Sequence, residues 1–496
     1  TVLGPKRAYN SRMESPDESD LGALRKFGYA QELARVLGGF SNFAISLSII
    51  CILAGGITSF HVGFCSVGGA SIGLGWPLVG LFALCVAAAM GQIASAFPTA
   101  GGLYHWSAML GGRGWGWITA WFNLLGLVAV LAAINVGVVR FAWAAFASGE
   151  PPSDELQLAL VAAITASHAV VNHLGIRVTR VLTDFSGYWI VFVSLALTVS
   201  LLAAAPTWDF ERLVTFTNFS GRPEAAPVWP ASDSLFVLFA LGALLPAYTI
   251  TGFDASAHVS EETSDARRNV PRGIVRSVWV SALFGWLMLC AAVLAMRDPA
   301  AAAEQGEAAF PFTMGDVLPR ALHLGLLGGI VIAQYLCGLA TVTSASRMAF
   351  AFARDGGLPF SHQVRFVSPR FRTPPVAIWR VASAAVAFTV YAAAYATIAA
   401  AAAVLLYISY VLPTALGYLA YGSTWTEMGP WTLGRWFRPL AAISVIGCGG
   451  LVLVGMQPPN EKAAVVVLGM GASLALGWFM GARRRFPGPP HLRDAA

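Results

Sequence analysis

Long apolar runs, repeated along the whole chain, restrict the possible folds of this sequence more than any other feature. Hydrophobic residues make up 57% of the 496 residues and charged residues only 11%, whereas soluble domains average roughly 45–50% and 25%. Runs of about 17–25 apolar residues are long enough to cross a lipid bilayer as helices. The sequence therefore predicts an all-α integral membrane protein.

We expect about twelve membrane-spanning helices, five before a polar segment at 206–233 and seven after it. The predicted spans are Gly38–His61, Trp76–Phe97, Trp115–Phe146, Leu158–Ala169, Trp189–Ala205, Leu235–Val259, Ser277–Met296, Leu322–Phe352, Val376–Ala394, Ile398–Tyr421, Leu440–Met456 and Ala463–Met480. The fourth run is short, and few residues typical of a turn separate the ninth span from the tenth. The number of spanning helices therefore falls between eleven and thirteen.

The basic residues predict the orientation of these helices. Lys and Arg concentrate in short cytoplasmic loops of membrane proteins. If the N-terminus lies in the cytoplasm and twelve helices cross the membrane, most of the 31 basic residues fall on the cytoplasmic side. We therefore expect both termini in the cytoplasm of a multi-pass protein, with the plasma membrane as the default location. The basic residues form no continuous stripe with interleaved aromatics, which argues against nucleic acid as a partner.

The predicted organisation has six parts. They are a cytoplasmic tail (1–35), a first five-helix segment (36–205), an extracellular loop (206–233), a second five-helix segment (234–421), helices 11 and 12 (422–480) and a second cytoplasmic tail (481–496). The first tail has neither the apolar core nor the small-residue cleavage site of a signal peptide.

Motifs for an enzyme, a metal site or a cofactor site are absent from the sequence. The six cysteines are scattered through apolar runs without metal-ligand spacing. The sequence shows no Ser/His/Asp order, no HExxH and no phosphate-binding loop. We therefore expect no catalytic residues, no metal and no cofactor, and the lack of a ring-forming selectivity sequence argues against a channel.

Two of the predicted spans are chemically interrupted. The first contains Ala54-Gly55-Gly56, and the second contains Pro246, Gly252 and Asp254 within nine residues. Glycine and proline weaken a helix, and freed backbone groups inside a membrane must find other partners. Because the breaks fall in the first helix of each five-helix segment, they predict the binding site of a transporter.

A broken helix offers binding groups that an intact helix does not. The exposed N–H groups of one half can hold a carboxylate, and the carbonyls of the other half can hold an ammonium group or a cation. Asp254 is the only acid expected well inside a span, so it must face a cavity, a partner or a proton. Alternatively, it caps the half-helix Ala255–Glu261. His258 lies one helical turn further on and can share a proton with Asp254.

Several motifs together resemble the amino acid/choline transporter family, within the amino acid, polyamine and organocation superfamily. The sixth-helix signature of that family resembles GFDASAHVSEET at 252–263 followed by NVPRGI at 269–274. Supporting motifs are FPTAGGLY at 97–104, Ser346-Arg347, ARDGGLP at 353–359 and LYISY at 406–410. They occur in the order and spacing of the family from the second helix to the tenth.

The resemblance implies a leucine-transporter-like five-plus-five inverted repeat, two extra C-terminal helices and alternating access around a midplane site. It implies that the first break cradles the substrate carboxylate, that nearby carbonyls approach the amine, and that Tyr248 is an aromatic lid. A tyrosine simply packed between helices is the alternative for Tyr248. The candidate substrate-binding residues are Cys51, Ile52, Ala54, Gly55, Gly56, Tyr248, Thr251, Gly252, Phe253, Asp254 and Tyr407.

We expect transport to be proton-coupled or to occur by exchange, with a proton or sodium as the possible coupling ion. Some relatives carry a lysine on the fifth helix in place of sodium, but Trp189–Ala205 has no ionisable side chain. Asp254 with His258 is therefore the candidate proton-coupling pair. The hydroxyls of Thr341, Thr343 and Ser344 form a possible ion site, although such hydroxyls more often bond neighbouring backbone.

Three functions are open at this point. A small amino acid, including γ-aminobutyrate, suits the small-residue cradle, so transport of such an amine is the preferred prediction. Choline or another quaternary amine instead requires an aromatic cage, which Tyr248, Phe253, Tyr407 and Asp254 would supply. A non-transporting nutrient sensor of the same fold is the third possibility, although the two short tails offer it little output segment.

Overall fold

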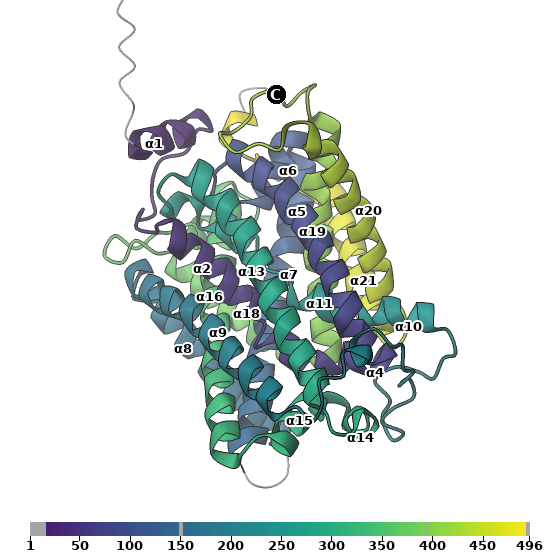
Figure 1. The fold of residues 1–496 in the computed structure, drawn as a ribbon. Helices are drawn as coiled ribbons and strands as arrows, with labels where there is room; N and C mark the ends of the chain where they lie inside the picture. Colours follow the sequence, from purple (N-terminus) through teal and green to yellow (C-terminus); the bar gives the residue numbers. More distant parts are fainter. Residues whose placement is uncertain (1–15, 148–151, 392–394, 493–496) are drawn as a thin grey trace, which may run out of the picture.

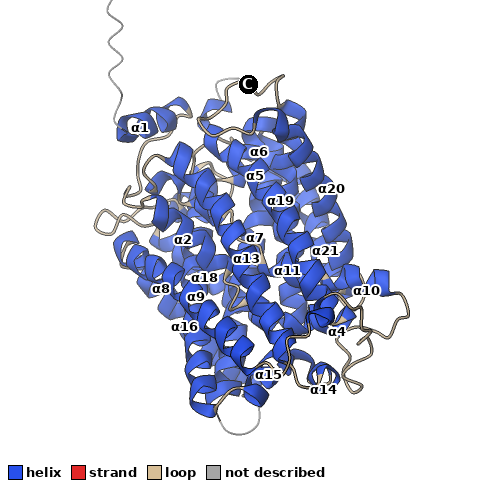
Figure 2. Ribbon diagram, viewed as in Figure 1, coloured by secondary structure: helices blue, strands red, loops and turns tan. Residues whose placement is uncertain are grey.

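The computed structural model describes residues 16–147, 152–391 and 395–492. Within these ranges every regular element is a helix, and the only β-type pairing is in two isolated β-bridges (Figure 2). The all-α membrane fold predicted from the apolar runs is confirmed.

The helices follow the predicted runs closely. They are α1 (Pro16–Lys26), α2 (Gly39–Ile50), α3 (Gly55–Thr58), α4 (Phe60–Val67), α5 (Trp76–Ala96), α6 (Leu103–Gly111), α7 (Arg113–Phe146), α8 (Asp154–His173), α9 (Ile176–Ala204), α10 (Leu235–Gly242), α11 (Leu244–Thr249), α12 (Ala255–His258), α13 (Ala266–Ala295), α14 (Pro299–Ala303), α15 (Ala309–Val317), α16 (Arg320–Arg354), α17 (Ser361–Val364), α18 (Pro375–Tyr391), α19 (Tyr395–Ala420), α20 (Phe437–Gly455), α21 (Glu461–Gly477) and α22 (Arg483–Arg485). Short 3-10 and π-helical segments are η1 (Ser71–Gly75), η2 (Phe210–Leu213), η3 (Ser260–Glu262), η4 (Gly306–Ala308), η5 (Gly434–Trp436), η6 (Trp478–Ala482) and η7 (Pro490–Leu492).

Twelve apolar helical segments correspond to the twelve predicted spans. Among the described residues, ten are long and apolar enough to cross a membrane, and two shorter ones cover Leu235–Thr249 and Pro375–Val390. The end of the predicted ninth span, 392–394, lies outside the described residues.

The predicted fifth span starts too late. It was expected to begin at Trp189, but α9 begins at Ile176, because a short polar stretch does not stop a helix that packs on its neighbours. Asp184 therefore lies inside α9, where it accepts a hydrogen bond from Ser41 Oγ at 3.0 Å. Asp254 is thus not the only carboxylate within a spanning segment.

The bundle has two distinct ends. Helix α1 and the C-terminus lie at one end, here called the terminal end, and α4, α10, α14 and α15 lie at the other, here called the distal end (Figure 1). Helices α7 and α16 contain 34 and 35 residues, which at about 1.5 Å per residue is enough to run the full depth of the bundle.

Helix α2 lies in the interior, whereas the last helices lie at the periphery. The candidate span that contains α2 is 83% buried, against 11% for the span Glu461–Arg485. Helices α20 and α21 run along one edge of the bundle (Figure 1). An apolar helix on the edge is stable only if lipid covers it, whereas α2 can carry polar groups because protein surrounds it.

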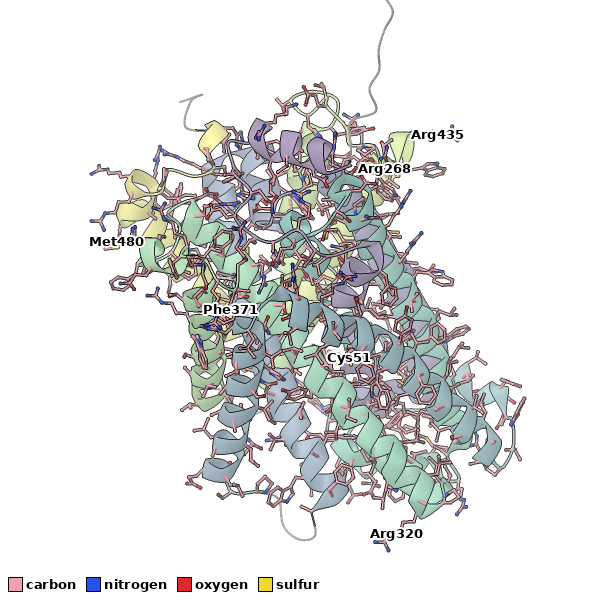
Figure 3. The ribbon with its side chains drawn as sticks, turned by 90° about the vertical axis from the view of Figure 1, so that its left-hand side faces the viewer. Cys51, Arg268, Arg320, Phe371, Arg435 and Met480 are labelled. Atoms are coloured by element: carbon pink, nitrogen blue, oxygen red, sulfur yellow. The ribbon has the colours of Figure 1, made fainter. Side chains whose placement is uncertain are left out.

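The first break lies at mid-depth of the bundle. The chain leaves α2 at Cys51, which has φ 25°, and resumes a helix at Gly55. Figure 3 shows Cys51 about half-way between Arg268 near the terminal end and Arg320 at the distal end. The predicted break in the first span is therefore confirmed.

The second break lies directly beside the first. Helix α11 ends at Thr249 and α12 begins at Ala255, with Gly252 at φ +87° between them. A side chain on Gly252 would also stand 2.3 Å from Ile49 Cγ2 of α2. Only glycine combines this backbone conformation with so close an approach.

We predict that Gly252→Ala lowers the stability of the purified protein by about 1–3 kcal/mol, because alanine at this φ and distance is both strained and overpacked. Thermal unfolding in detergent measures the change. Gly450→Ala is the matched control, since Gly450 lies in exposed α20 with no atom within 4 Å of an added Cβ. Equal melting temperatures for the two variants would contradict the close approach of the two breaks.

Candidate functional site

Both broken helices border one cavity, here called the central cavity. The first break contributes Ala54 and Gly55, and the second contributes Tyr248 and Thr251. The remaining walls come from α7 and α16, including Gln334. Its open space is only about 20 Å³, which is room for about one water molecule. The cavity must widen before a solute with several heavy atoms can bind.

A wider hollow adjoins the central cavity on the side of the distal end. It has about 200 Å³ of open space and shares Thr58 and Gly137 with the central cavity. Arg140 and Glu307 also line it, with 3.9 Å between Arg140 Nη1 and Glu307 Oε2. Because both charged side chains are more than a third exposed, the hollow reaches the distal surface.

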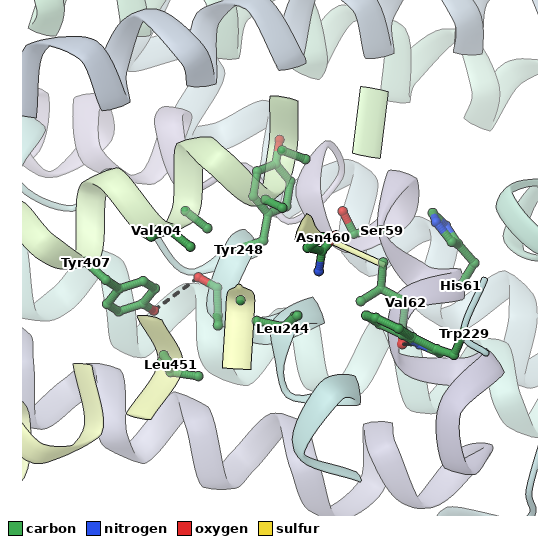
Figure 4. Close-up of a pocket in the computed structure, with 15 residues that line it drawn as sticks. Ser59, His61, Val62, Trp229, Leu244, Tyr248, Val404, Tyr407, Leu451 and Asn460 are labelled. Atoms are coloured by element: carbon green, nitrogen blue, oxygen red, sulfur yellow. Dashed lines mark hydrogen bonds between the residues drawn. The ribbon is translucent and has the colours of Figure 1, made fainter. Parts of the chain in front are cut away.

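A third cavity, of about 70 Å³, also borders Tyr248 (Figure 4). It is lined by residues of α4, α11, α19 and α20 and by Trp229 of the loop at 206–233. Tyr407 lies at this cavity, where its hydroxyl donates to the carbonyl of Ala247 at 3.1 Å. Tyr248 lines both cavities and so forms part of the wall between them.

Asp254 lies fully buried in a network of side chains. Its Oδ2 accepts a hydrogen bond from Asn123 Nδ2 at 2.8 Å and lies 3.1 Å from His258 Nε2, and its Oδ1 accepts from the Tyr410 hydroxyl at 2.8 Å. Asp254 and His258 therefore lie in direct contact, and their role in proton coupling stays a prediction. The alternative that Asp254 caps the next half-helix is wrong, since its side chain makes no capping bond.

Tyr410 ties the second break to α19. Its hydroxyl accepts from the backbone N–H of Gly252 at 2.9 Å and donates to Asp254. The ring of Phe253 packs against that of Tyr410, with centroids 4.8 Å apart. One tyrosine thus satisfies a freed backbone group and the buried carboxylate at the same time.

The predicted substrate residues divide into three groups. The central cavity is lined by Ala54, Gly55, Tyr248 and Thr251. Tyr407 lines the neighbouring cavity. The remaining residues are buried without lining either cavity, and these are Cys51, Ile52, Gly56, Gly252, Phe253 and Asp254.

The first break is closely packed in this conformation. A side chain on Gly55 would stand 3.0 Å from Thr249 Cα, so the two broken helices touch at this point. The N–H groups of Ala54 and Gly55 both donate to the carbonyl of Cys51. Binding of a carboxylate to these groups therefore requires the break to open.

The hydroxyls of the predicted ion site are fully buried, and two of them already donate elsewhere. Thr341 Oγ1 donates to Cys337 O at 2.9 Å, and Thr343 Oγ1 lies within hydrogen-bond distance of Asn172 Oδ1 and Leu339 O. Ser344 Oγ has no partner among the described residues. The ion site stays a prediction.

A cluster of buried polar groups closes the terminal end. Oδ2 of Asp355 accepts hydrogen bonds from the hydroxyls of Tyr29 and Tyr104 at 2.7 and 2.8 Å and lies 3.0 Å from His105 Nε2. Burial raises the pKa of Tyr29, so the hydroxyl stays protonated as a donor. Burial also acts to raise the pKa of Asp355, but the hydrogen bond with His105 and the charges of His105 and Arg354 outweigh it and leave the pKa below its ordinary value.

Two buried ion pairs extend this cluster. Glu261 binds Arg354 through both carboxylate oxygens, at 2.8 and 3.0 Å, and Glu262 binds Arg347 in the same way, at 3.0 and 3.2 Å. Glu261 also accepts from the backbone N–H of Ala100. The cluster and these two pairs, here called the terminal seal, join the chain before α2, the start of α6 with the residue Ala100 before it, the end of the second broken helix and the end of α16.

Three residues of the site, Asn123, Tyr410 and Gln334, were not indicated by the sequence pattern. Asn123 and Gln334 are amide side chains inside apolar helices, a feature that by itself indicates a bonded interior position. Tyr410 lies in the motif LYISY at 406–410, which indicates the family and not the role of this tyrosine. Their partners come from helices distant in sequence, so spacing alone does not reveal them.

An all-helical bundle with apolar spanning helices, two of them broken at one central cavity that is closed toward one end, is the architecture of a multi-pass membrane transporter. Comparison with known proteins identifies the family. The model of the family "Amino acid permease" matches residues 37–474. The chain therefore belongs to the amino acid permease family, whose members are transporters and not enzymes.

Three curated relatives show the extent of this similarity. Amino-acid permease BAT1 of Arabidopsis thaliana is 32% identical over 504 residues, which cover 94% of this chain and 95% of the relative. The GABA-specific permease of Saccharomyces cerevisiae is 29% identical over 370 residues, covering 73% and 64%. Amino-acid permease 2 of Neurospora crassa is 26% identical over 519 residues, covering 99% and 92%.

We predict that Tyr410→Phe destabilises the protein more than Tyr407→Phe. The first change leaves a buried N–H and a carboxylate oxygen without a partner, at about 1–3 kcal/mol for each group, whereas the second leaves only one carbonyl. Thermal unfolding of both variants in the same detergent is the measurement. A larger loss for Tyr407→Phe would show that Tyr410 does not hold the second break.

Proposed function

We propose that this chain transports a small amino acid or a related amine such as γ-aminobutyrate across the plasma membrane by alternating access, as a member of the amino acid/choline transporter family. The observation that supports this most is the central cavity, because both broken helices border it at mid-depth. Both termini lie in the cytoplasm, and the first and second five-helix segments form an inverted repeat.

The arrangement of aromatic side chains favours an amino acid over choline. A cage for a quaternary amine needs several aromatic faces and a carboxylate around one space. Here Phe253 and Asp254 are fully buried away from the central cavity, and Tyr407 lies at the neighbouring one. Of the four cage residues, only Tyr248 borders the central cavity.

Asp254 and His258 are the proposed site of proton coupling. A carboxylate and an imidazole 3.1 Å apart can hold one proton between them. Asp254 reaches the backbone of the second break through Tyr410. A change in its protonation would therefore alter the bonds that fix the break, which links proton binding to the shape of the cavity.

The terminal seal is the proposed inner gate. The hollow beside Arg140 adjoins the central cavity and reaches the distal surface, while buried ion pairs lie at the terminal end. With the terminal end in the cytoplasm, this conformation is closed to the inside. Release of a solute to the cytoplasm then requires the Glu261–Arg354 pair or its neighbours to separate.

Thermal stabilisation of the purified protein tests the substrate class, because ligand binding raises the apparent stability by mass action. The panel contains small amino acids, γ-aminobutyrate, choline and polyamines. We expect a shift only with amines that carry a carboxylate. A shift with choline alone would overturn the proposed substrate, and binding without uptake into proteoliposomes would favour the sensor.

We predict that Asp254→Asn abolishes concentrative uptake driven by a proton gradient while exchange of bound solute persists. The asparagine amide has the shape of the aspartate carboxylate but does not take up and release a proton. Proteoliposomes with and without the gradient separate the two activities. Asp184→Asn is the control, because Asp184 is also an aspartate within a spanning helix but binds Ser41 and Arg180. Undiminished gradient-driven uptake by Asp254→Asn would exclude Asp254 from coupling.

A further inference from the structure

One buried polar atom at the central cavity is without a hydrogen bond. Gln334 lies near the middle of α16, is 1% exposed and lines the central cavity beside Ala54 and Gly55. Its Nε2 donates to the carbonyl of Leu53 at 3.2 Å. No donor in the part of the chain that the structure describes reaches its Oε1.

The bond to Leu53 fixes the orientation of the amide. If the amide were turned by 180°, Oε1 would face the carbonyl of Leu53, and two acceptors would repel each other. The carbonyl of Leu53 belongs to the first break, so it cannot be satisfied within its own helix. Gln334 therefore satisfies this carbonyl with its nitrogen and leaves its oxygen as an acceptor at the cavity.

The three threonine hydroxyls of the cavity wall are used differently. The hydroxyls of Thr58, Thr249 and Thr251 donate to backbone carbonyls of their own segments, at 2.7, 2.8 and 2.8 Å. The wall contributed by α7 is apolar, with Val130, Ala133, Ile134 and Gly137. Gln334 Oε1 is therefore a strong acceptor in a largely apolar space, where a charged donor gains the most.

We propose that Gln334 Oε1 accepts a hydrogen bond from the ammonium group of the transported amine, and that this bond makes an N–H donor a requirement for tight binding. The inference rests on the proposed function and specifies its substrate class. A primary ammonium has three N–H donors, whereas a quaternary amine has none and would leave the buried oxygen unpaired. Sites built around such a bond reject analogues that lack the donor.

A series of γ-aminobutyrate derivatives with zero to three N-methyl groups isolates this bond. All four compounds carry the carboxylate and the positive charge, and each methyl group removes one N–H donor. Affinities come from thermal stabilisation of the purified full chain, together with competition for uptake of labelled γ-aminobutyrate in proteoliposomes. A parallel series from glycine to its trimethyl form covers α-amino acids.

We expect the trimethyl compound to bind the unchanged protein at least about tenfold more weakly than the primary amine, as expected for losing a hydrogen bond to a charged group. Gln334→Met, which keeps the length of the side chain, should weaken the primary amine by a similar factor and leave the trimethyl compound nearly unchanged. Gln334→Glu keeps an acceptor at the cavity and should retain the preference for N–H donors, but it should lower the stability because its second oxygen faces the carbonyl of Leu53.

Gln92→Met is the matched control. Gln92 is also a fully buried glutamine, but its Oε1 accepts from the backbone N–H of Leu433 and its Nε2 bonds Met428 Sδ. This variant should keep the full discrimination between the primary and trimethyl compounds, whatever its stability.

The outcomes separate the inference from the proposed function. If Gln334→Met weakens all four compounds equally, Gln334 only supports the first break through Leu53 and the inference is wrong. If the unchanged protein binds all four equally, the requirement for a donor does not exist. If it binds no compound of either series, the proposed function fails as well.

Discussion

The whole site depends on one constraint: a helix that is interrupted inside a membrane must find new partners for its freed backbone groups. In this chain, side chains from other helices supply them. Ser46 donates to the carbonyl of Phe253, Tyr410 accepts from the N–H of Gly252, and Gln334 donates to the carbonyl of Leu53. The two breaks are therefore held by α2, α19 and α16, so a movement of any of these helices changes the shape of the central cavity.

The charged groups of the terminal seal also need partners, because they are buried. A buried charge is tolerated only when it is paired and hydrogen-bonded, and Arg347, Arg354, Glu261 and Glu262 meet this condition through bidentate contacts. Such pairs are specific in geometry yet contribute little net stability, because desolvation offsets most of their attraction. A gate made of them can therefore close in a defined register without locking the protein permanently in one conformation.

Sequence patterns predicted the helices well, because a membrane span needs only a long apolar run. They also located both breaks, since Gly55, Gly252 and Pro246 are unfavourable inside any helix. They were less informative about contacts. The apolar run predicts a start at Trp189, whereas α9 begins at Ile176 and includes the polar residue Asp184. The partners of Asp254 were not predicted because Asn123 and Tyr410 lie far away in sequence. Polar pairing across helices is set by packing and not by spacing.

The small size of the central cavity affects how measured affinities should be understood. At about 20 Å³, the resting site does not fit an amino acid, so part of the binding energy is used to separate the two broken helices where Gly55 meets Thr249. The observed dissociation constant then equals the intrinsic dissociation constant divided by the fraction of molecules already expanded. A solute too small to force this separation would bind without driving the cycle, and one that held the helices apart permanently would bind tightly and stop it.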